Sequence, residues 1–236
     1  METQKHPITA LVKSDSGKEI VSEYIENLIG ILTCDPVAAL KTMCNLSRAP
    51  STIRDAIFFE CLKTFLLNTY RYNPSAQRFE AAILKPFAEA LAEASPNADA
   101  GYDGNEEKLV EYAKRIIKLI DDCGTNQKAR YLASLARAVI SQQIDTRKFF
   151  QLSRIIRTMT EEDLDFLHEY IREGVHVEDN EEYIDDYCAL GLMFEDQKGG
   201  YTYSLRAFEL MKYSLAYEET FRIPNNLPKK ASHLLI

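Results

Sequence analysis

The sequence lacks tryptophan, holds only four histidines, and has just 9 glycines and 8 prolines in 236 residues. The histidines form no H-x-x-x-H or H-E-x-x-H spacing, which excludes the common helical zinc motifs. No G-x-x-x-x-G-K, G-x-G-x-x-G or G-x-S-x-G run occurs, so the usual signatures of nucleotide binding and of serine hydrolases are absent. We therefore expect a protein without enzyme activity, cofactor or metal ion.

A long hydrophobic run is missing as well. The most apolar stretch, residues 53–67, is interrupted by four charged residues and falls short of the roughly 20 apolar residues that a membrane span needs. Residues 1–8 are polar and lack the apolar region of a secretory signal. The five cysteines form no C-x-x-C pair, which is typical of reduced thiols. The sequence predicts a cytoplasmic protein that does not enter a membrane.

Apolar residues recur every three or four positions over most of the first 170 residues, which is the pattern of amphipathic helices. The scarcity of glycine and proline also favours long regular elements. Asp145, and Thr160 with Asp163, have the spacing of residues that cap helix N-termini. The predicted helices lie at about 20–32, 36–46, 52–70 (at the centre of the bundle), 74–94 (broken near Pro86), 109–120, 129–140, 146–159 and 161–171.

The last third of the chain changes character. A predicted helix over 181–190 is followed by two short predicted strands, 192–194 and 201–203, and by a helix over 205–218. Helix, helix, hairpin and helix is the outline of a winged-helix unit, and the steps Leu190-Gly191-Leu192 and Tyr201-Thr202-Tyr203 resemble those that flank its wing. We expect a mainly α protein: a multi-helix bundle over 1–159, a winged-helix-like unit with a short β-hairpin over 160–220, and an extended tail over 221–236.

The charges are distributed very unevenly along a chain whose net charge is −8. Residues 137–159 hold five basic residues and one acid, a local charge of about +4, whereas residues 160–198 hold fourteen acids and two basic residues, about −12. A winged helix that binds DNA lays its second helix in the major groove, where the phosphates require lysine and arginine. Here that helix is acidic, which disfavours DNA binding through it.

The acidic run suggests a face that meets the basic surface of a protein partner or of another copy of the chain. Ordinary solvation of the surface would produce the same pattern. The candidate partner-binding residues are Glu178, Asp179, Glu181, Glu182, Asp185 and Asp186. The alternative is a winged-helix transcriptional regulator that contacts DNA through Arg147, Lys148, Arg154 and Arg157.

Three short stretches in the middle of the chain carry a family resemblance. They are Ile53-Arg54-Asp55 leading into two pairs of apolar residues (58–59 and 65–66), the segment 128–132 (KARYL), and Phe149-Phe150 with Leu152 before Asp163-Leu164. Over roughly residues 30–172 the chain resembles a diverse family of bacterial and prophage-borne helical proteins of unknown function. It departs from that family at Glu60-Cys61, where a basic residue is frequent.

The resemblance transfers no catalytic residue, and it implies a setting of phage–host conflict. Together with the acidic face, it leads to the hypothesis of a non-enzymatic protein-interaction module that acts in phage defence, in superinfection immunity or in its regulation. The third class of function is an enzyme with a site assembled from dispersed carboxylates and tyrosines.

Overall fold

The computed structural model describes residues 53–70, 72–73, 78–79, 87–95, 106–171, 177, 183–197 and 199–220. Most of these residues are helical, and a short antiparallel hairpin lies near the C-terminal end, so the expected mainly α class is confirmed. The helices predicted over 20–32 and 36–46 and the tail over 221–236 lie outside the described residues. No helix in the described part combines the length and apolar character needed to cross a bilayer.

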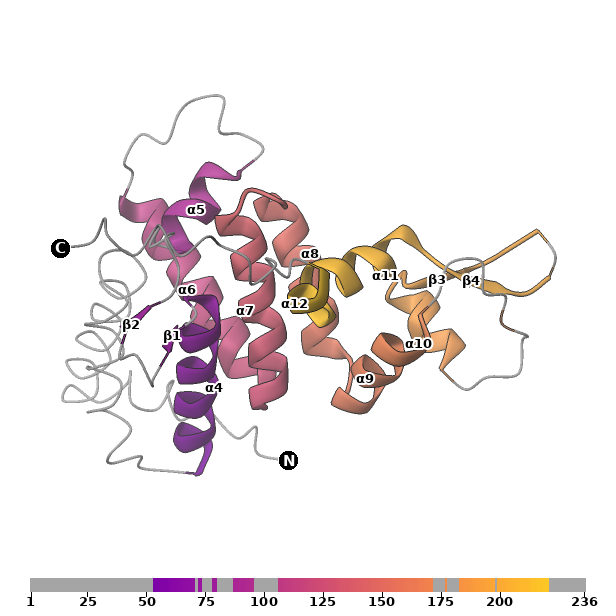
Figure 1. Ribbon diagram of the computed structural model, residues 1–236, viewed down its shortest axis with the longest axis horizontal. Coiled ribbons are helices and arrows are strands. Elements are labelled where there is room, and N and C mark those ends of the chain that lie inside the picture. The colour runs from indigo at the N-terminus through magenta and orange to yellow at the C-terminus, as the bar shows by residue number, and fades with distance from the viewer. Residues whose placement is uncertain are drawn as a thin grey trace, which may run out of the picture. The chain divides into compact units, whose positions relative to one another are not determined.

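The chain divides by its internal contacts into two compact units, Met1–Asp163 and Leu164–Ile236. Five described helices make up unit 1 (Figure 1). They are α4 (Ile53–Thr69), α5 (Phe87–Glu93), α6 (Glu106–Cys123), α7 (Asn126–Ile140) and α8 (Thr146–Thr158).

Helix α7 lies at the centre of unit 1. It packs against α4, α5, α6 and α8, and nine of its fifteen residues are buried. Its buried alanines let neighbouring helices approach closely, which explains why a helix with modest side chains holds this position. Helix α4, predicted to be central, packs extensively against α7 and also against α6, while Ile57, assigned to its buried face, is 43% exposed.

Aromatic side chains connect the ends of the surrounding helices. The Phe87 ring of α5 lies 5.9 Å from that of Phe65 on α4 and 5.2 Å from that of Phe149 on α8, centroid to centroid. All three rings are buried. The Tyr70 hydroxyl accepts a hydrogen bond from the Phe87 backbone N–H at 3.1 Å, which caps the first turn of α5.

The capping residues at the start of α8 and α9 (Glu161–Tyr170) were predicted correctly. The Asp145 carboxylate accepts a hydrogen bond from the Lys148 N–H at 2.6 Å. The Thr160 hydroxyl accepts from the Asp163 N–H at 3.1 Å, while Asp163 accepts from the Thr160 N–H at 3.3 Å, a reciprocal capping box. These short polar side chains supply acceptors for N–H groups that have no partner within the helix.

Helix α7 ends in a Schellman motif. The Gln143 N–H donates to the Ala138 carbonyl and the Gln142 N–H to the Val139 carbonyl, both at 2.8 Å. The motif requires a left-handed residue between helix and loop, and Gln142 fills that position with a φ of +55°. Glycine is the usual residue there because it carries no Cβ.

One helical prediction in unit 1 needs correction. The helix expected to begin after residue 73 is absent at 78–79, where β2 (Arg78–Phe79) pairs antiparallel with β1 (Tyr72–Asn73). Helix α5 begins only at Phe87, directly after Pro86 in the sequence. Apolar spacing alone did not distinguish a short hairpin from the first turns of a helix.

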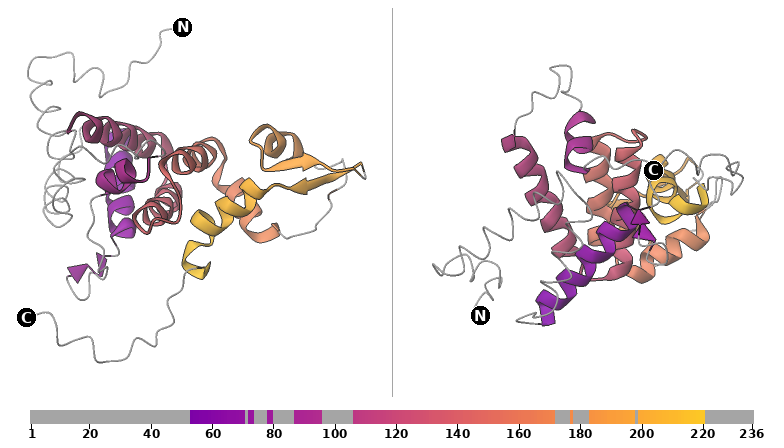
Figure 2. Two further views of the ribbon diagram at one scale, coloured as in Figure 1. Left: turned by 90° about the horizontal axis from the view of Figure 1, so that it is seen from above. Right: turned by 60° about the vertical axis from the view of Figure 1, so that its left-hand side comes forward.

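Unit 2 is built from short elements. After α9 come α10 (Ile184–Ala189), β3 (Met193–Glu195), β4 (Tyr201–Tyr203) and α11 (Leu205–Leu210), which continues through the π-helical turn η2 (Met211–Leu215) into α12 (Tyr217–Thr220). The strands form the predicted hairpin, with Met193 opposite Tyr203 and Glu195 opposite Tyr201 (Figure 2). The predicted helices 181–190 and 205–218 are respectively shorter and interrupted.

Among the described residues, Val177 extends this hairpin beyond β4. Val177 forms an antiparallel bridge with Tyr201, through two N–H to carbonyl bonds of 2.9 Å. Since Tyr201 also pairs with Glu195, β4 lies between β3 and Val177. The sequence pattern did not predict this bridge.

The turn before β3 is tightly held. Gly191 has a φ of +69°, and a Cβ added there would lie 2.3 Å from Arg206 Nη1. The same guanidinium group donates to the Leu190 carbonyl at 3.2 Å. The Ser204 hydroxyl donates to the Gly191 carbonyl at 2.6 Å and accepts from the Ala207 N–H, thereby also capping α11. Helix α11 and the turn into the hairpin are thus joined by polar contacts.

Candidate functional site

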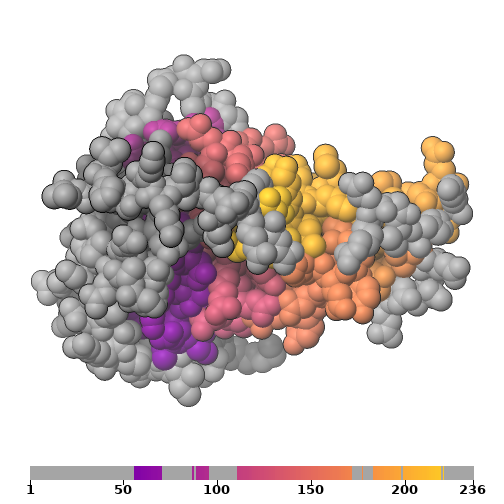
Figure 3. Space-filling model, in the orientation of Figure 1, coloured from indigo at the N-terminus to yellow at the C-terminus, as the bar shows by residue number. Residues whose placement is uncertain are grey.

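The predicted acidic face is described at two of its six residues. Asp185 and Asp186 are exposed on α10, which carries no basic residue, while Ile184 and Tyr187 of the same helix are buried. Glu178, Asp179, Glu181 and Glu182 lie outside the described residues. We call Asp185 and Asp186 the acidic face. In Figure 3, which is coloured by residue number, α9 and α10 lie in the orange part of the surface.

The two carboxylates of the acidic face have no ion-pair partner among the described residues. Apolar side chains are exposed elsewhere on unit 2: Tyr170 is 50%, Phe194 52% and Leu205 75% exposed. Uncompensated charge with large exposed apolar side chains is a composition suited to contact with another macromolecule.

Aromatic packing fixes the orientation of α10. The Phe166 ring of α9 lies 4.4 Å from Tyr170 and 4.8 Å from Tyr183, whose ring is in turn 5.1 Å from that of Tyr187. This ladder joins α9 to the start of α10. Since Tyr187 is buried on one side of α10, Asp185 and Asp186 are directed to solvent on the other.

The four predicted basic residues do not share one surface. Successive residues of an α-helix are rotated by about 100°, so Arg147 and Arg154, seven residues apart, lie on one side of α8. Arg157 is close to that side and forms an ion pair with Asp122 of α6 at 3.2 Å. Lys148 is nine residues from Arg157 and therefore points to the opposite side of the helix. The structure thus brings together only three of the four.

A fifth basic residue, Arg115 of α6, joins them. Its guanidinium carbon lies 3.7 Å from the centroid of the Phe150 ring, and Phe150 occupies the side of α8 between Arg147 and Arg154. The Tyr112 ring stacks on Phe150 at 6.3 Å and 17°. Counting charges by segment could not find Arg115, because its approach to Phe150 depends on the packing of α6 against α8.

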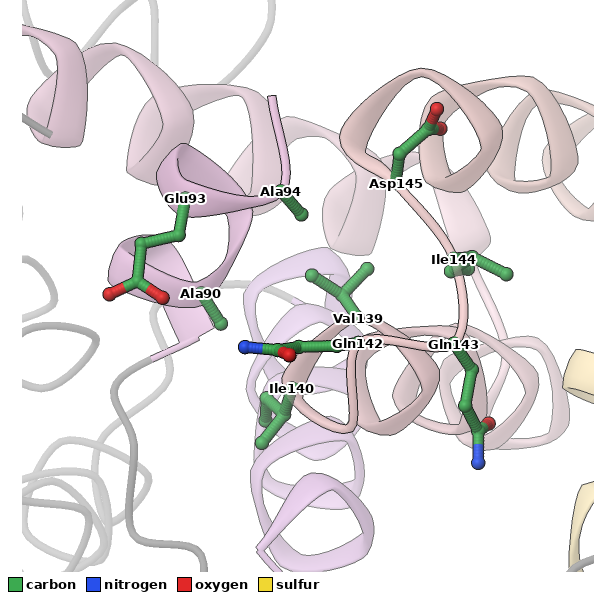
Figure 4. Close-up of a pocket in the computed structure, with 9 residues that line it drawn as sticks. All are labelled: Ala90, Glu93, Ala94, Val139, Ile140, Gln142, Gln143, Ile144 and Asp145. Carbon is green, nitrogen blue, oxygen red and sulfur yellow. The ribbon is translucent and has the colours of Figure 1, made fainter. Parts of the chain in front are cut away.

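A hollow of about 410 Å³ lies between the end of α5 and the loop after α7 (Figure 4). Its lining is apolar on Ala90, Val139 and Ile140. Glu93, Gln142, Gln143 and Asp145 supply the polar atoms; the Gln142 side chain extends toward α5 and that of Gln143 points away. Of its two carboxylates, that of Asp145 caps α8 by accepting from the Lys148 N–H.

The buried thiols are poorly suited to nucleophilic chemistry. Burial raises the pKa of the Cys61 thiol from 9.0 to about 11 and that of Cys123 to about 12, with neighbouring acids adding to the first. Neither is a thiolate at neutral pH. Within the described ranges no group of three or more His, Cys, Asp or Glu side chains is placed to hold a metal ion.

Comparison with known proteins adds no relative. No family model, curated protein or solved structure matches this chain. The function of the chain must therefore be inferred from its two charged surfaces.

Proposed function

We propose that the chain is a non-enzymatic protein-interaction module whose acidic face captures a partner with a basic surface. The observation that carries this proposal is the exposure of Asp185 and Asp186, unpaired among the described residues, on a helix without basic residues. Their carboxylates repel nucleic acid phosphates and attract lysine and arginine, so complementarity favours a protein.

We also propose that unit 2 is a winged-helix-like unit. Support comes from the order Val177, β4, β3 across the small sheet and from α10 directly before the hairpin. In such a unit the helix ahead of the wing is the recognition element. Acidic residues on α10 repel the phosphates beside a DNA groove and favour contact with a basic protein surface instead.

The test is capture of partners by the immobilised full chain from nuclease-treated and untreated lysate. We expect a nuclease-resistant protein partner whose capture falls at least about tenfold when Asp185 and Asp186 are replaced by Lys. The matched control is the pair Glu162→Lys and Glu169→Lys, two exposed acids of α9. Capture that the α10 substitutions leave unchanged would overturn the proposal.

We also propose a role in phage defence, superinfection immunity or its regulation. This role rests on the three short stretches within residues 53–66, 128–132 and 149–164, and no family model matches them. A host that expresses the chain is expected to plate phage less efficiently than one that carries the Asp185→Lys, Asp186→Lys variant. Equal plating of a panel of phages on both hosts would remove this role while leaving the interaction module in place.

DNA binding through unit 1 is the second candidate, favoured by Arg147 and Arg154, which are exposed and have no ion pair with a described residue. If it holds, Arg154→Ala with Arg157→Ala weakens binding to random duplex DNA. The salt slope then falls by about one for each phosphate that the variant no longer neutralises. An unchanged slope would exclude this helix as the DNA-binding element.

A further inference from the structure

The surface between α6 and α8 holds an arginine in a fixed orientation. The Arg115 guanidinium group lies over Phe150 at 3.7 Å, and Tyr112 stacks on the same ring. A guanidinium group placed over an aromatic ring is held there by cation–π attraction and can still bind a carboxylate or phosphate through its N–H groups. Arg115 is exposed, so these N–H groups are accessible.

Two further arginines flank this stack. Arg147 and Arg154 lie three residues before and four residues after Phe150, which puts all three on one side of α8. Both arginines are exposed, and neither has an ion pair with a described residue. We call Arg115, Arg147 and Arg154, with the Tyr112 and Phe150 rings, the guanidinium face. Of its three guanidinium groups, that of Arg115 is the one that an aromatic ring holds in place.

The small number of arginines in the guanidinium face favours carboxylates over a nucleic acid as its ligand. Asp122 already neutralises Arg157, which leaves three guanidinium groups, whereas duplex-binding proteins commonly neutralise about 6–10 phosphates. The net charge of −8 also opposes the approach of a polyanion. A pair of carboxylates on a protein surface matches three guanidinium groups better in number and in total charge.

Such a pair is present on every copy of the chain. Asp185 and Asp186 are exposed on unit 2, and Glu195 is exposed on β3 of the same unit. We propose that the guanidinium face of one copy binds the acidic face of a second copy. This inference rests on the proposed function, because it uses the same acidic face and names its partner.

The contact is heterologous, because it joins two different surfaces. A dimer keeps one unused guanidinium face on one copy and one unused acidic face on the other, so assembly continues into rings or longer chains as concentration rises. The interface is charged and exposed, so salt weakens it. The average mass of the protein in solution should therefore rise with protein concentration and fall with ionic strength.

Sedimentation velocity of the full chain tests this directly. At low salt the weight-average mass is expected to increase with concentration, and high salt is expected to return it to the monomer. Arg147→Glu with Arg154→Glu, or Asp185→Arg with Asp186→Arg, should each weaken association at least about tenfold, because attraction becomes repulsion. Lys148→Glu, on another side of α8, is the matched control and should leave association unchanged.

Complementation makes the test specific. In an equimolar mixture of the two reversed variants, the native acidic face of one meets the native guanidinium face of the other, and the two reversed faces also attract each other. The mixture should therefore regain concentration-dependent growth as an alternating assembly, whereas each variant alone should not. Placing all four reversals in one chain should restore concentration-dependent growth. Failure of both, with each protein folded by circular dichroism, would overturn the proposal.

The remaining outcomes separate this inference from the proposed function. A chain that stays monomeric at every salt concentration, yet still captures a basic protein through Asp185 and Asp186, refutes self-association and leaves the proposed function standing. A monomeric chain that binds duplex DNA through Arg147 and Arg154 refutes self-association in favour of a nucleic acid ligand.

Discussion

Unit 1 and unit 2 are stabilised in different ways. The helices α4, α6, α7 and α8 of unit 1 have 13 to 18 residues each and share a core of buried apolar and aromatic side chains. The helices and strands of unit 2 from α10 to α11 have 3 to 6 residues. They are joined by hydrogen bonds that the Ser204 and Arg206 side chains donate to the backbone carbonyls of Gly191 and Leu190. Unit 1 should therefore be most sensitive to loss of volume, and unit 2 to changes in its turns.

The largest effect is expected from Phe149→Ala in unit 1. Removing this buried ring should lower the free energy of unfolding by about 3–5 kcal/mol, because a cavity remains between α5 and α8. Hydrogen exchange should increase in α4 to α8 and remain unchanged in α10 to β4. Phe194→Ala, at an exposed ring, is the control and should change stability by less than about 0.5 kcal/mol. Equal increases of exchange in both units would show that they unfold together.

A smaller effect is expected from Gly191→Ala in unit 2. The substitution places a Cβ at positive φ and against Arg206, so we expect stability to fall by about 1–2 kcal/mol, measured by denaturant unfolding. Gly124→Ala in unit 1 is matched in φ, at +69°, but meets no atom within 4 Å. Gly124→Ala should therefore lower the stability less than Gly191→Ala does, and the difference measures the cost of displacing the Arg206 side chain. If the two variants are equally destabilised, the position of Arg206 contributes nothing.

Gln142→Gly should have an effect of the opposite sign. Glycine adopts a φ of +55° without steric opposition from a Cβ, so unit 1 should gain about 0.5–1 kcal/mol. Thermal unfolding measures the gain, and Gln143→Gly serves as the control because Gln143 does not have positive φ. A loss of stability in Gln142→Gly would mean that the side chain at the hollow contributes more than the backbone strain.

The last prediction concerns stability at alkaline pH and expects no change at neutral pH. Burial raises the pKa of Cys61 from 9.0 to about 11 and of Cys123 from 9.0 to about 12 in unit 1, and that of Tyr203 from 10.0 to about 12 in unit 2. Each group stays protonated in the folded state, so its contribution is complete below the unfolded pKa and is lost as pH rises through the folded one. Burial also raises the pKa of Cys188 in unit 2 from 9.0, so both units should begin to weaken from about pH 9, and unit 1, which buries two such thiols more deeply, should weaken more steeply. Hydrogen exchange corrected for intrinsic rates would contradict this if unit 2 weakened more steeply.

The sequence predicted those features that depend on a few neighbouring residues. Asp145, Thr160 and Asp163 cap the helices as expected, because an N-cap needs only an acceptor at the right spacing. The hairpin across Gly199-Gly200 was found within one residue of its position, for the same reason. Local chemistry is sufficient at these points.

The features that were missed depend on packing between distant segments. The approach of Arg115 to Phe150 joins residues 35 apart in sequence, and the bridge between Val177 and Tyr201 joins residues 24 apart. The central position of α7 follows from its small side chains rather than from the most apolar pattern. For the candidate site, residue type identified Arg147 and Arg154, while only geometry separated them from Lys148.

The π-helical turn η2 gives the last described helix a particular dependence on chain length. The Ala216 N–H donates to the Met211 carbonyl five residues earlier, so this turn contains one residue more than an α-helix would use. Deleting one residue from Met211–Leu215 would replace this turn by an ordinary α-helical turn with a hydrogen bond four residues back. Ala216 and Tyr217, both buried, would then keep nearly their present direction, because the π-helical turn already accommodates the extra residue. A deletion in the regular part of α11 would instead rotate them by about 100°, so the π-helical turn is where this helix can lose a residue without changing its phase.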